Sequence, residues 1–439
     1  MMDSFKIVEH TIAGQHIREH PHSVRGRQEA VLQLAIKQYI PLDDAHSIPD
    51  NAVTVIGVHG NGSPKELFEP FWEHLYAHLK KRSVPLRAIW IADVSNQGAS
   101  GVLNEAVQGD TTPWYDHSRD LLHMVNHFRD KMPRPMIGVA HSMGCNQLFV
   151  TTSTPRNLTI LLLIIPLRVH LSILHPRLLS TLILYEPIIF ERGWGPMNPA
   201  KLVSRRQDLW ETREKAETAL RKIFQKWNPR VVDRLVQFGI RPLPTKLYNK
   251  QTNLNLPTSA VTLTTTRHQE SWSYTIPNLE PESAGLDRLL LPDWDTEAER
   301  PYKFGRPEVW SCMRNLPFVR PSVLLAFGSR SYLSPPDERA AKLRKTGIGA
   351  GGSGGAAQGM VEQHVFEGAS HTLVFEQIDE STEVAADWIR RWFQGWLADE
   401  NILAEYQSKR SAMDMTKASE ASVQTTLVQT GTKRPNAKL

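Results

Sequence analysis

The sequence has little cysteine, little net charge and only short apolar runs. Two cysteines, Cys145 and Cys312, occur among 439 residues, and no charged-then-apolar leader opens the chain, which argues against a secreted fold held by disulfides. The apolar stretch at residues 158–167 is too short for a membrane span, which needs about 20 residues. The net charge is +5, and residues 401–439 hold six basic against three acidic side chains, so the rest of the chain offers no footprint for nucleic acid.

The composition that is present describes a folded chain with a large core. Hydrophobic residues make up 41% of the chain and charged residues 22%, and twelve tryptophans are present, which excludes wholesale disorder. The length exceeds the limit of about 250–300 residues for a single core. We therefore expect one large domain with an insertion, or two domains.

Short apolar runs alternate with amphipathic patterns over the first 190 residues. Residues 65–82 and 117–132 place apolar side chains on one helical face, whereas the apolar runs between them have the length of buried strands. This alternation is typical of an α/β fold with a mostly parallel sheet flanked by helices. The expected strands cover residues 52–58, 86–92, 136–140, 179–184, 322–327 and 361–366.

The alternation fails at residues 191–320, which we interpret as an inserted helical cap. A helical pattern at residues 202–227 is followed there by a stretch rich in Pro and Thr. The sequence thus predicts a core in two parts, residues 1–190 and 321–400, separated by the cap. Residues 401–439 turn to Ser, Thr, Lys, Gln and Ala without periodicity, so we expect a disordered tail.

Residues 149–168 do not fit this plan. They interrupt the helix expected after the serine turn described next, and Pro155 and Pro166 would both break such a helix. Removing the segment joins Leu148 to Val169 and restores a helix of ordinary length. We interpret the segment as an atypical insertion, with non-coding sequence wrongly read as coding as the leading hypothesis.

The strongest chemical signal is the run IGVAHSMG at residues 137–144. An apolar strand leads into a tight turn with Ser142 at its apex, and helix-type residues follow. This is the G-x-S-x-G nucleophile elbow with Ala140 at the first small position. Small residues are needed two positions before and after the serine because neighbouring chains approach closely there. We predict that Ser142 is a nucleophile rather than an ordinary loop serine.

A glycine-rich loop precedes the first long helix, in the order Val58, His59, Gly60, Asn61, Gly62. In acyl-transfer enzymes such a loop supplies one N–H of the oxyanion hole, and the residue after the nucleophile supplies the other. Asn61 or Gly62, together with Met143, fit these positions. An ordinary turn is the alternative interpretation of the loop.

A serine nucleophile needs a base and an acid, which follow it in the chain. His371 is favoured as the base because it alone among the histidines follows the final expected strand. Two candidates remain for the acid. Glu186 directly follows the strand at 179–184, whereas Asp337 follows the next strand by several residues. We favour Glu186 and keep Asp337 as the alternative.

Other candidate sites are weaker. His123 and His127 have the spacing of a metal pair, but no carboxylate or cysteine completes a set, and we predict no metal site. Residues 347–355 are glycine-rich but lack the Lys-Ser/Thr of a phosphate loop. The cap also carries basic residues that suit either a solvated helix face or the steering of an anionic substrate. They are Lys201, Arg205, Arg206, Arg213, Arg221 and Lys222.

The chain ends in Ala437, Lys438 and Leu439, which match the small-basic-leucine pattern of the peroxisomal address S-K-L. On an exposed, mildly basic tail this tripeptide predicts recognition by the peroxisomal import receptor. A cytoplasmic location is the alternative.

Several segments together resemble a known family. They are HIREHP (16–21), PKEL (64–67), IWIAD (89–93), DHSRDLL (116–122) and NHFRD (126–130). Over roughly residues 5–400, apart from the insertion, the chain is similar to fungal peroxisomal α/β-hydrolases of secondary metabolism, including those of host-selective toxin clusters and of mycophenolic acid biosynthesis. In that family the acid follows the strand after the nucleophile helix, which corresponds to Glu186, although the family carries Asp there.

The resemblance implies an α/β-hydrolase fold and a serine thioesterase or esterase that acts on acyl-CoA without a metal or organic cofactor. It also implies a Ser142, His371 and Glu186 triad. A carboxylester or glycerolipid hydrolase is the second hypothesis, and a catalytically inactive binding protein of the same fold is the third.

Overall fold

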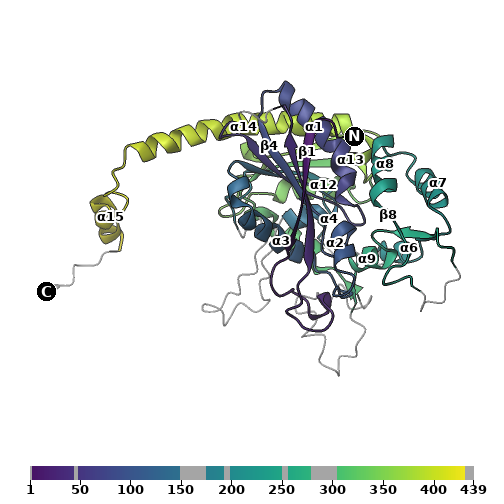
Figure 1. Ribbon diagram of the computed structural model, residues 1–439. Coiled ribbons are helices and arrows are strands. Elements are labelled where there is room, and N and C mark those ends of the chain that lie inside the picture. The colour runs from purple at the N-terminus through teal and green to yellow at the C-terminus, as the bar shows by residue number, and fades with distance from the viewer. Residues whose placement is uncertain are drawn as a thin grey trace. The chain divides into compact units, whose positions relative to one another are not determined.

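The computed structural model describes residues 2–43, 48–148, 175–191, 198–249, 256–277 and 304–430 (Figure 1). The chain divides into two compact units, Met1–Ile389 and Arg390–Leu439. The interpreted insertion at 149–168 and the C-terminal tripeptide at 437–439 lie outside the described residues.

The first unit is built on a mostly parallel sheet. Within the described residues its eight strands run in the order β1-β2-β4-β3-β5-β6-β12-β13. The pairs β1/β2 and β2/β4 are antiparallel, and every later pair is parallel. The strands are β1 (Phe5–Ala13), β2 (Gln33–Pro41), β3 (Val53–Val58), β4 (Leu86–Ala92), β5 (Met136–His141), β6 (Thr181–Tyr185), β12 (Ser322–Gly328) and β13 (Val361–Phe366).

Helices follow or connect most of these strands. The expected helix at 65–82 begins as a 3₁₀ turn over Lys65–Phe68 and continues as α1, and the helix expected at 117–132 is α3, which starts three residues earlier. The helices of this part are α1 (Glu69–Lys81), α2 (Gly98–Leu103), α3 (Trp114–His127), α4 (Met143–Leu148), α11 (Pro307–Asn315), α12 (Pro336–Lys345), α13 (Leu373–Glu376) and α14 (Ile378–Ser408), the last crossing into the second unit.

Alternate residues of β6 point to opposite faces of the sheet. Leu182 and Leu184 join a buried cluster with side chains of α3, α4 and α11. Tyr185 instead packs against Phe71 of α1, with ring centroids 5.6 Å apart, and donates a hydrogen bond to the carbonyl of Ser381 in α14 at 2.7 Å. The sheet is therefore covered on both faces, as its apolar strands require.

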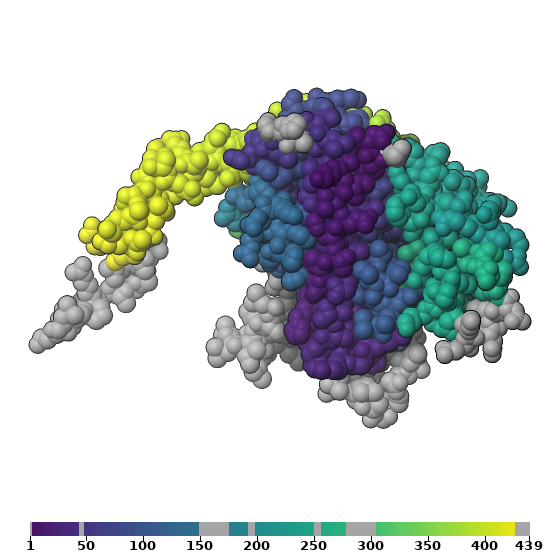
Figure 2. Space-filling view, in the orientation of Figure 1, coloured from purple at the N-terminus to yellow at the C-terminus, as the bar shows by residue number. Residues whose placement is uncertain are grey.

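The cap contains a small sheet as well as helices. Its helices are α6 (Ala200–Val203), α7 (Arg213–Ile223), α8 (Pro229–Phe238) and α9 (Arg267–Trp272), and its strands β7 (Leu209–Trp210), β8 (Ile240–Pro242) and β9 (Val261–Leu263) pair in the order β7-β9-β8. Figure 2 shows these residues, in teal and green, beside the purple N-terminal strands.

Two expectations for the cap are wrong. A continuous helix over 202–227 is interrupted, because β7 pairs with β9 and Thr212 then caps the start of α7 by accepting a hydrogen bond from the N–H of Lys215. The cap also ends before residue 320. Helix α11 belongs to the core, where Cys312, Met313 and Leu316 join the main apolar cluster.

Over residues 401–430 the structure differs from the expected disordered tail, whereas residues 431–439 lie outside the described residues. In the second unit, residues 401–408 continue α14 and Glu420–Thr430 form α15. Glu405 and Lys409, four residues apart, form an ion pair at 2.6 Å. Local helix propensity and such pairs sustain helices where no apolar periodicity exists, so composition alone was a poor guide here. No helix among the described residues is long and apolar enough to cross a membrane.

Candidate active site

Ser142 occupies the tight turn between β5 and α4. Its backbone φ is +57°, which is rare for a residue other than glycine, and its N–H donates a hydrogen bond to the carbonyl of Tyr185 at 2.8 Å. A Cβ atom added to Gly144 would lie 2.6 Å from the carbonyl oxygen of Val58. Glycine is therefore required two residues after the serine, as the elbow pattern predicts.

Ser142, His371 and Glu186 come together at the ends of three strands. His371 lies beyond β13, and its Nε2 is 2.8 Å from Ser142 Oγ. Its Nδ1 is 3.0 Å from Glu186 Oε2, in the residue that follows β6. A hydroxyl, an imidazole and a carboxylate thus form one hydrogen-bonded series, the arrangement by which a base activates a serine.

Glu186 is only 1% exposed, and its carboxylate is surrounded by donors. The N–H of Gly328 donates to Oε1 at 2.7 Å, and the hydroxyls of Ser331 and Ser334 each donate to Oε2 at 2.6 Å. Burial alone would raise the pKa of Glu186, but the hydrogen bonds from His371 and the two serines lower it below the usual value. Glu186 is therefore held as a carboxylate facing the imidazole.

Asp337, the alternative acid, has a different position. It lies in the first turn of α12 and is exposed to solvent. The geometry therefore favours Glu186 as the partner of His371.

Two N–H groups in the loop after β3, those of Asn61 and Gly62, are candidate donors to an oxyanion, and the structure distinguishes between them. The N–H of Gly62 already donates to Gln97 Oε1 at 2.8 Å, so the structure does not support Gly62 as an oxyanion donor. This leaves the N–H of Asn61 as the donor from the loop. Met143 is the first residue of α4, where helix geometry leaves the backbone N–H without a partner inside the helix.

Gln97 is a polar residue of the site that sequence patterns did not indicate. It is completely buried, and besides accepting from Gly62 it donates from Nε2 to Asn61 Oδ1 at 2.6 Å and to Ser273 Oγ at 2.9 Å. Asn61 in turn donates from Nδ2 to the carbonyl of Glu270 at 2.9 Å. The loop after β3 is thereby bonded to α9 of the cap.

His141 was also missed, although it directly precedes the serine. Burial, together with the nearby His371, lowers the pKa of His141 to about 3, so its imidazole is neutral at physiological pH. Its Nε2 lies 2.8 Å from the carbonyl oxygen of His371, which fits donation by an Nε2–H tautomer. His141 thus ties the loop that carries His371 to the strand that carries Ser142.

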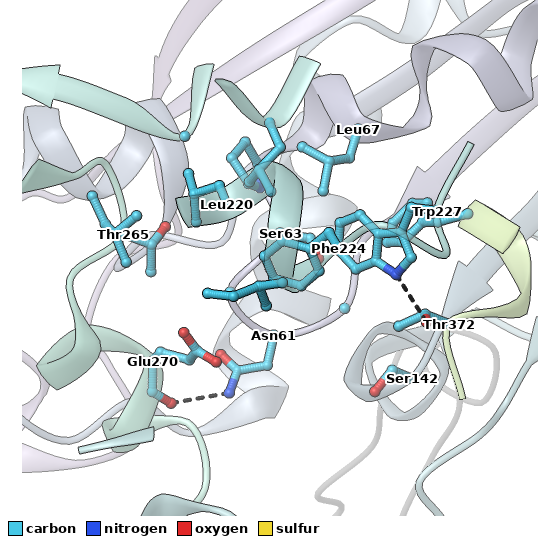
Figure 3. Close-up of a pocket in the computed structure, with 18 of the residues that line it drawn as sticks. Asn61, Ser63, Leu67, Ser142, Leu220, Phe224, Trp227, Thr265, Glu270 and Thr372 are labelled. Carbon is cyan, nitrogen blue, oxygen red and sulfur yellow. Dashed lines mark hydrogen bonds between the residues drawn. The ribbon is translucent and has the colours of Figure 1, made fainter. Parts of the chain in front are cut away.

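A cavity of about 210 Å³ opens beside Ser142 and His371 (Figure 3). Trp227 of the cap lies over it and donates from Nε1 to Thr372 Oγ1 at 3.0 Å, next to His371. One part of the lining is apolar, with Leu67, Leu220, Phe224, Trp227, Leu235 and Phe375. The other part is polar, with Asn61, Arg206, Gln207, Glu270 and Tyr274.

The histidine pair of α3 and the cap cations Arg213 and Arg221 lie outside the cavity lining, whereas Arg206 is part of it. His123 and His127 stand 6.3 Å apart by ring centroids on α3, and no cluster of three metal-ligating side chains occurs in the described parts of the chain. Of the cap cations, Arg213 pairs with Glu217 at 3.2 Å and Arg221 with Asp233 at 2.8 Å. Arg221 therefore belongs to a solvated helix face, whereas Arg213 also donates from Nη2 to the carbonyl of Val236 at 2.6 Å and so links α7 to α8.

Comparisons with known proteins identify the family. A family model for the alpha/beta hydrolase family matches residues 55–387. The type I acyl-CoA thioesterase mpaH' of Penicillium brevicompactum is 35% identical over 408 residues, covering 89% of this chain and 88% of its own. The abhydrolase domain-containing protein ACTT2-1 of Alternaria alternata is 27% identical over 260 residues, covering 59% of this chain and 84% of its own.

A solved structure shows the same fold. The peroxisomal alpha-beta-hydrolase Lpx1 from Saccharomyces cerevisiae matches with a TM-score of 0.65 at 16% sequence identity, covering 98% of this chain and 97% of that one. The predicted fold class and the resemblance to fungal hydrolases are both confirmed. The chain is a hydrolase that belongs to the alpha/beta hydrolase family.

Proposed function

We propose that this hydrolase cleaves the thioester bond of an acyl-CoA, with Ser142 as nucleophile, His371 as base and Glu186 as the acid that orients it. The series of hydrogen bonds from Ser142 to His371 at 2.8 Å and on to Glu186 at 3.0 Å, beside a largely apolar cavity, carries the proposal. A thioester substrate is supported by the Penicillium relative, which is named an acyl-CoA thioesterase. The family resemblance favours a role in fungal secondary metabolism.

The proposed reaction has two stages. His371 Nε2 accepts the proton of Ser142 Oγ as the oxygen attacks the thioester carbonyl, and Glu186 stabilises the imidazolium that forms. The backbone N–H groups of Met143 and Asn61 stabilise the oxyanion. The C–S bond then breaks, the thiolate takes the proton from His371, and the acyl group stays on Ser142. In the second stage His371 takes a proton from water as the water oxygen attacks the acyl carbonyl. The bond between Ser142 Oγ and the acyl carbon then breaks, His371 returns the proton to Ser142 Oγ, and the carboxylic acid leaves.

A substrate panel tests this function. Purified enzyme should release free thiol from at least one of a series of acyl-CoAs with a higher kcat/KM than it shows for p-nitrophenyl esters of the same acids. Turnover of the oxygen esters alone would favour the second hypothesis, a carboxylester or glycerolipid hydrolase. Turnover of neither would favour a binding protein of the same fold.

We also propose that Gln97 positions the oxyanion loop, which yields a prediction for Gln97→Leu. The variant loses the hydrogen bonds to Asn61 and Gly62, so we expect kcat to fall by about 10- to 100-fold with little change in KM. Steady-state kinetics and the thermal midpoint should be measured together.

The neighbouring Asn96 offers a matched control. It is equally buried and also bonds the cap, from Nδ2 to the carbonyl of Gln269 at 3.0 Å, but the hydrogen bonds of the described residues do not link it to the oxyanion loop. Asn96→Leu should therefore lower the thermal midpoint with kcat largely kept. Equal losses of kcat in both variants would show that cap attachment, not loop position, is what matters.

We propose a peroxisomal location through the tripeptide Ala437, Lys438 and Leu439. A fluorescent protein that ends in residues 425–439 should enter peroxisomes, and deletion of Leu439 should leave it in the cytosol, as seen by microscopy. If both fusions stay cytosolic, the enzyme is cytoplasmic and the tripeptide is a coincidence.

We propose that residues 149–168 are absent from most of the protein in the cell. Pro155 and Pro166 stand behind the nucleophile turn, where a helix packs in this fold. Sequenced transcripts should therefore largely lack these codons. Transcripts that keep them in frame, together with a well-folded and active expressed protein, would instead identify a true surface insertion.

A further inference from the structure

Apart from Asn61, the residues in the polar part of the active-site cavity take no part in the chemistry described above. We propose that Arg206 and Glu270 form a subsite for a secondary amide in the leaving half of the thioester substrate. This inference rests on the proposed thioesterase function. It adds that the enzyme recognises the leaving half of the substrate as well as the acyl group.

The position of Glu270 places the subsite next to the reacting bond. A Cβ atom added to Gly62 would lie 2.8 Å from the carboxyl carbon of Glu270, so this carboxylate stands directly over the oxyanion loop. The backbone of Glu270 is held there by Asn61, as the dashed line in Figure 3 marks. A group attached to the carbonyl whose oxygen accepts from the Asn61 N–H therefore passes close to Glu270.

The hydrogen-bonding capacity of the pair suits an amide. The Glu270 side chain is only 8% exposed, and Arg206 is its ion-pair partner. Burial raises the pKa of Glu270, so a further N–H donor would stabilise its charged form. Arg206 Nε is buried and has no hydrogen-bond partner in the described part of the chain, so it needs an acceptor. A secondary amide supplies one donor and one acceptor in a single planar group.

The two parts of the cavity match the two halves of an acyl-CoA. The apolar part, around Leu67, Phe224 and Leu235, suits the acyl group. The pantetheine arm of CoA carries secondary amides, the nearer one separated from the sulfur by a short two-carbon link. The polar part reaches solvent at Gln207, which is exposed, and at Arg206, whose side chain is 32% exposed. The bulky remainder of CoA therefore has an exit.

The test compares three thioesters of one acyl group that the wild-type enzyme accepts. They are the CoA thioester, the N-acetylcysteamine thioester, which keeps the nearer amide, and the S-ethyl thioester, which has none. In Glu270→Gln, kcat/KM should fall about tenfold or more for the first two and less than threefold for the S-ethyl thioester. Arg206→Lys keeps the positive charge but loses Nε, and it should show the same selective loss.

A second cap ion pair provides the control. Arg221 and Asp233 pair on the cap surface, with side chains 48% and 59% exposed, and neither lines the cavity. Arg221→Gln should leave the ratios among the three substrates unchanged, and thermal midpoints should establish that all variants are folded. Equal losses for all three thioesters in both subsite variants, or no losses, would overturn the subsite while the thioesterase function stands. A wild-type enzyme that cleaves none of the three would overturn both.

Discussion

Ser142→Ala is expected to lower kcat for hydrolysis by several orders of magnitude, toward the 10⁶-fold order seen when the serine of a protease triad is removed. The variant loses the only group that attacks the carbonyl, whereas the oxyanion donors and the cavity remain. Ser142 is 8% exposed, and alanine removes one oxygen atom from it without adding any atom that could clash. The fold should therefore be kept. Steady-state rates and the circular dichroism spectrum check the two parts of this prediction.

An exposed cap serine gives the matched control for this substitution. Ser204 donates to the carbonyl of Lys201 at 3.2 Å and lies outside the cavity lining, so Ser204→Ala should retain full activity. A Ser142→Ala enzyme with more than about a tenth of the wild-type rate would contradict the nucleophile assignment.

Glu186→Gln is expected to reduce kcat by roughly four orders of magnitude, as removing the acid does in the serine-protease template. Glutamine keeps the length of the side chain but presents no negative charge to the His371 imidazolium. Its amide group also favours the wrong tautomer of the imidazole, because it can donate to Nδ1. Asp337→Asn should change kcat by less than about threefold, because that carboxylate is exposed in α12.

The comparison of these two variants decides which acid is used. Each substitution exchanges a carboxylate for an amide of the same size as the residue that it replaces. A difference between the two kcat values therefore reports which position supplies the acid. The reverse ranking of the two kcat values would move the acid to Asp337 in α12, after β12, and would weaken the correspondence with the fungal relatives.

The buried strands were predictable from sequence because their character is local. Residues 86–92 were expected as an apolar run and are β4 with the same limits. Residues 361–366 were also expected as a strand and are β13 with the same limits, although four of its six residues are not buried. The antiparallel strands β1 and β2 gave no such signal, because β2 contains Lys37. That side chain is buried beside Glu66 and Glu69, with which it forms ion pairs at 3.2 Å and which come from a later part of the chain, and it also pairs with Glu9 of β1 at 3.6 Å. The cap strands are two or three residues long and lack any periodic pattern.

The residues of the candidate site also differ in whether the sequence alone indicated them. Ser142, His371 and Glu186 were predictable because each follows a recognisable strand, and parallel strands bring such ends to one edge of the sheet. Gln97 and His141 were not, because their roles depend on hydrogen bonds to distant residues. Gln97 bonds Asn61, 36 positions away, and His141 bonds His371, 230 positions away. Such contacts cannot be recognised from the spacing of neighbouring residues in the sequence.

Covalent labelling with a fluorophosphonate is the most direct test of whether Ser142, activated by His371, attacks acyl-CoA. Intact-protein mass spectrometry and peptide mapping should find one label, on Ser142, and His371→Ala should abolish rapid labelling. An acyl-CoA that the enzyme hydrolyses should slow the labelling of the wild-type protein in proportion to its occupancy. A label on another residue, no label, or labelling that saturating acyl-CoA does not slow would contradict the account.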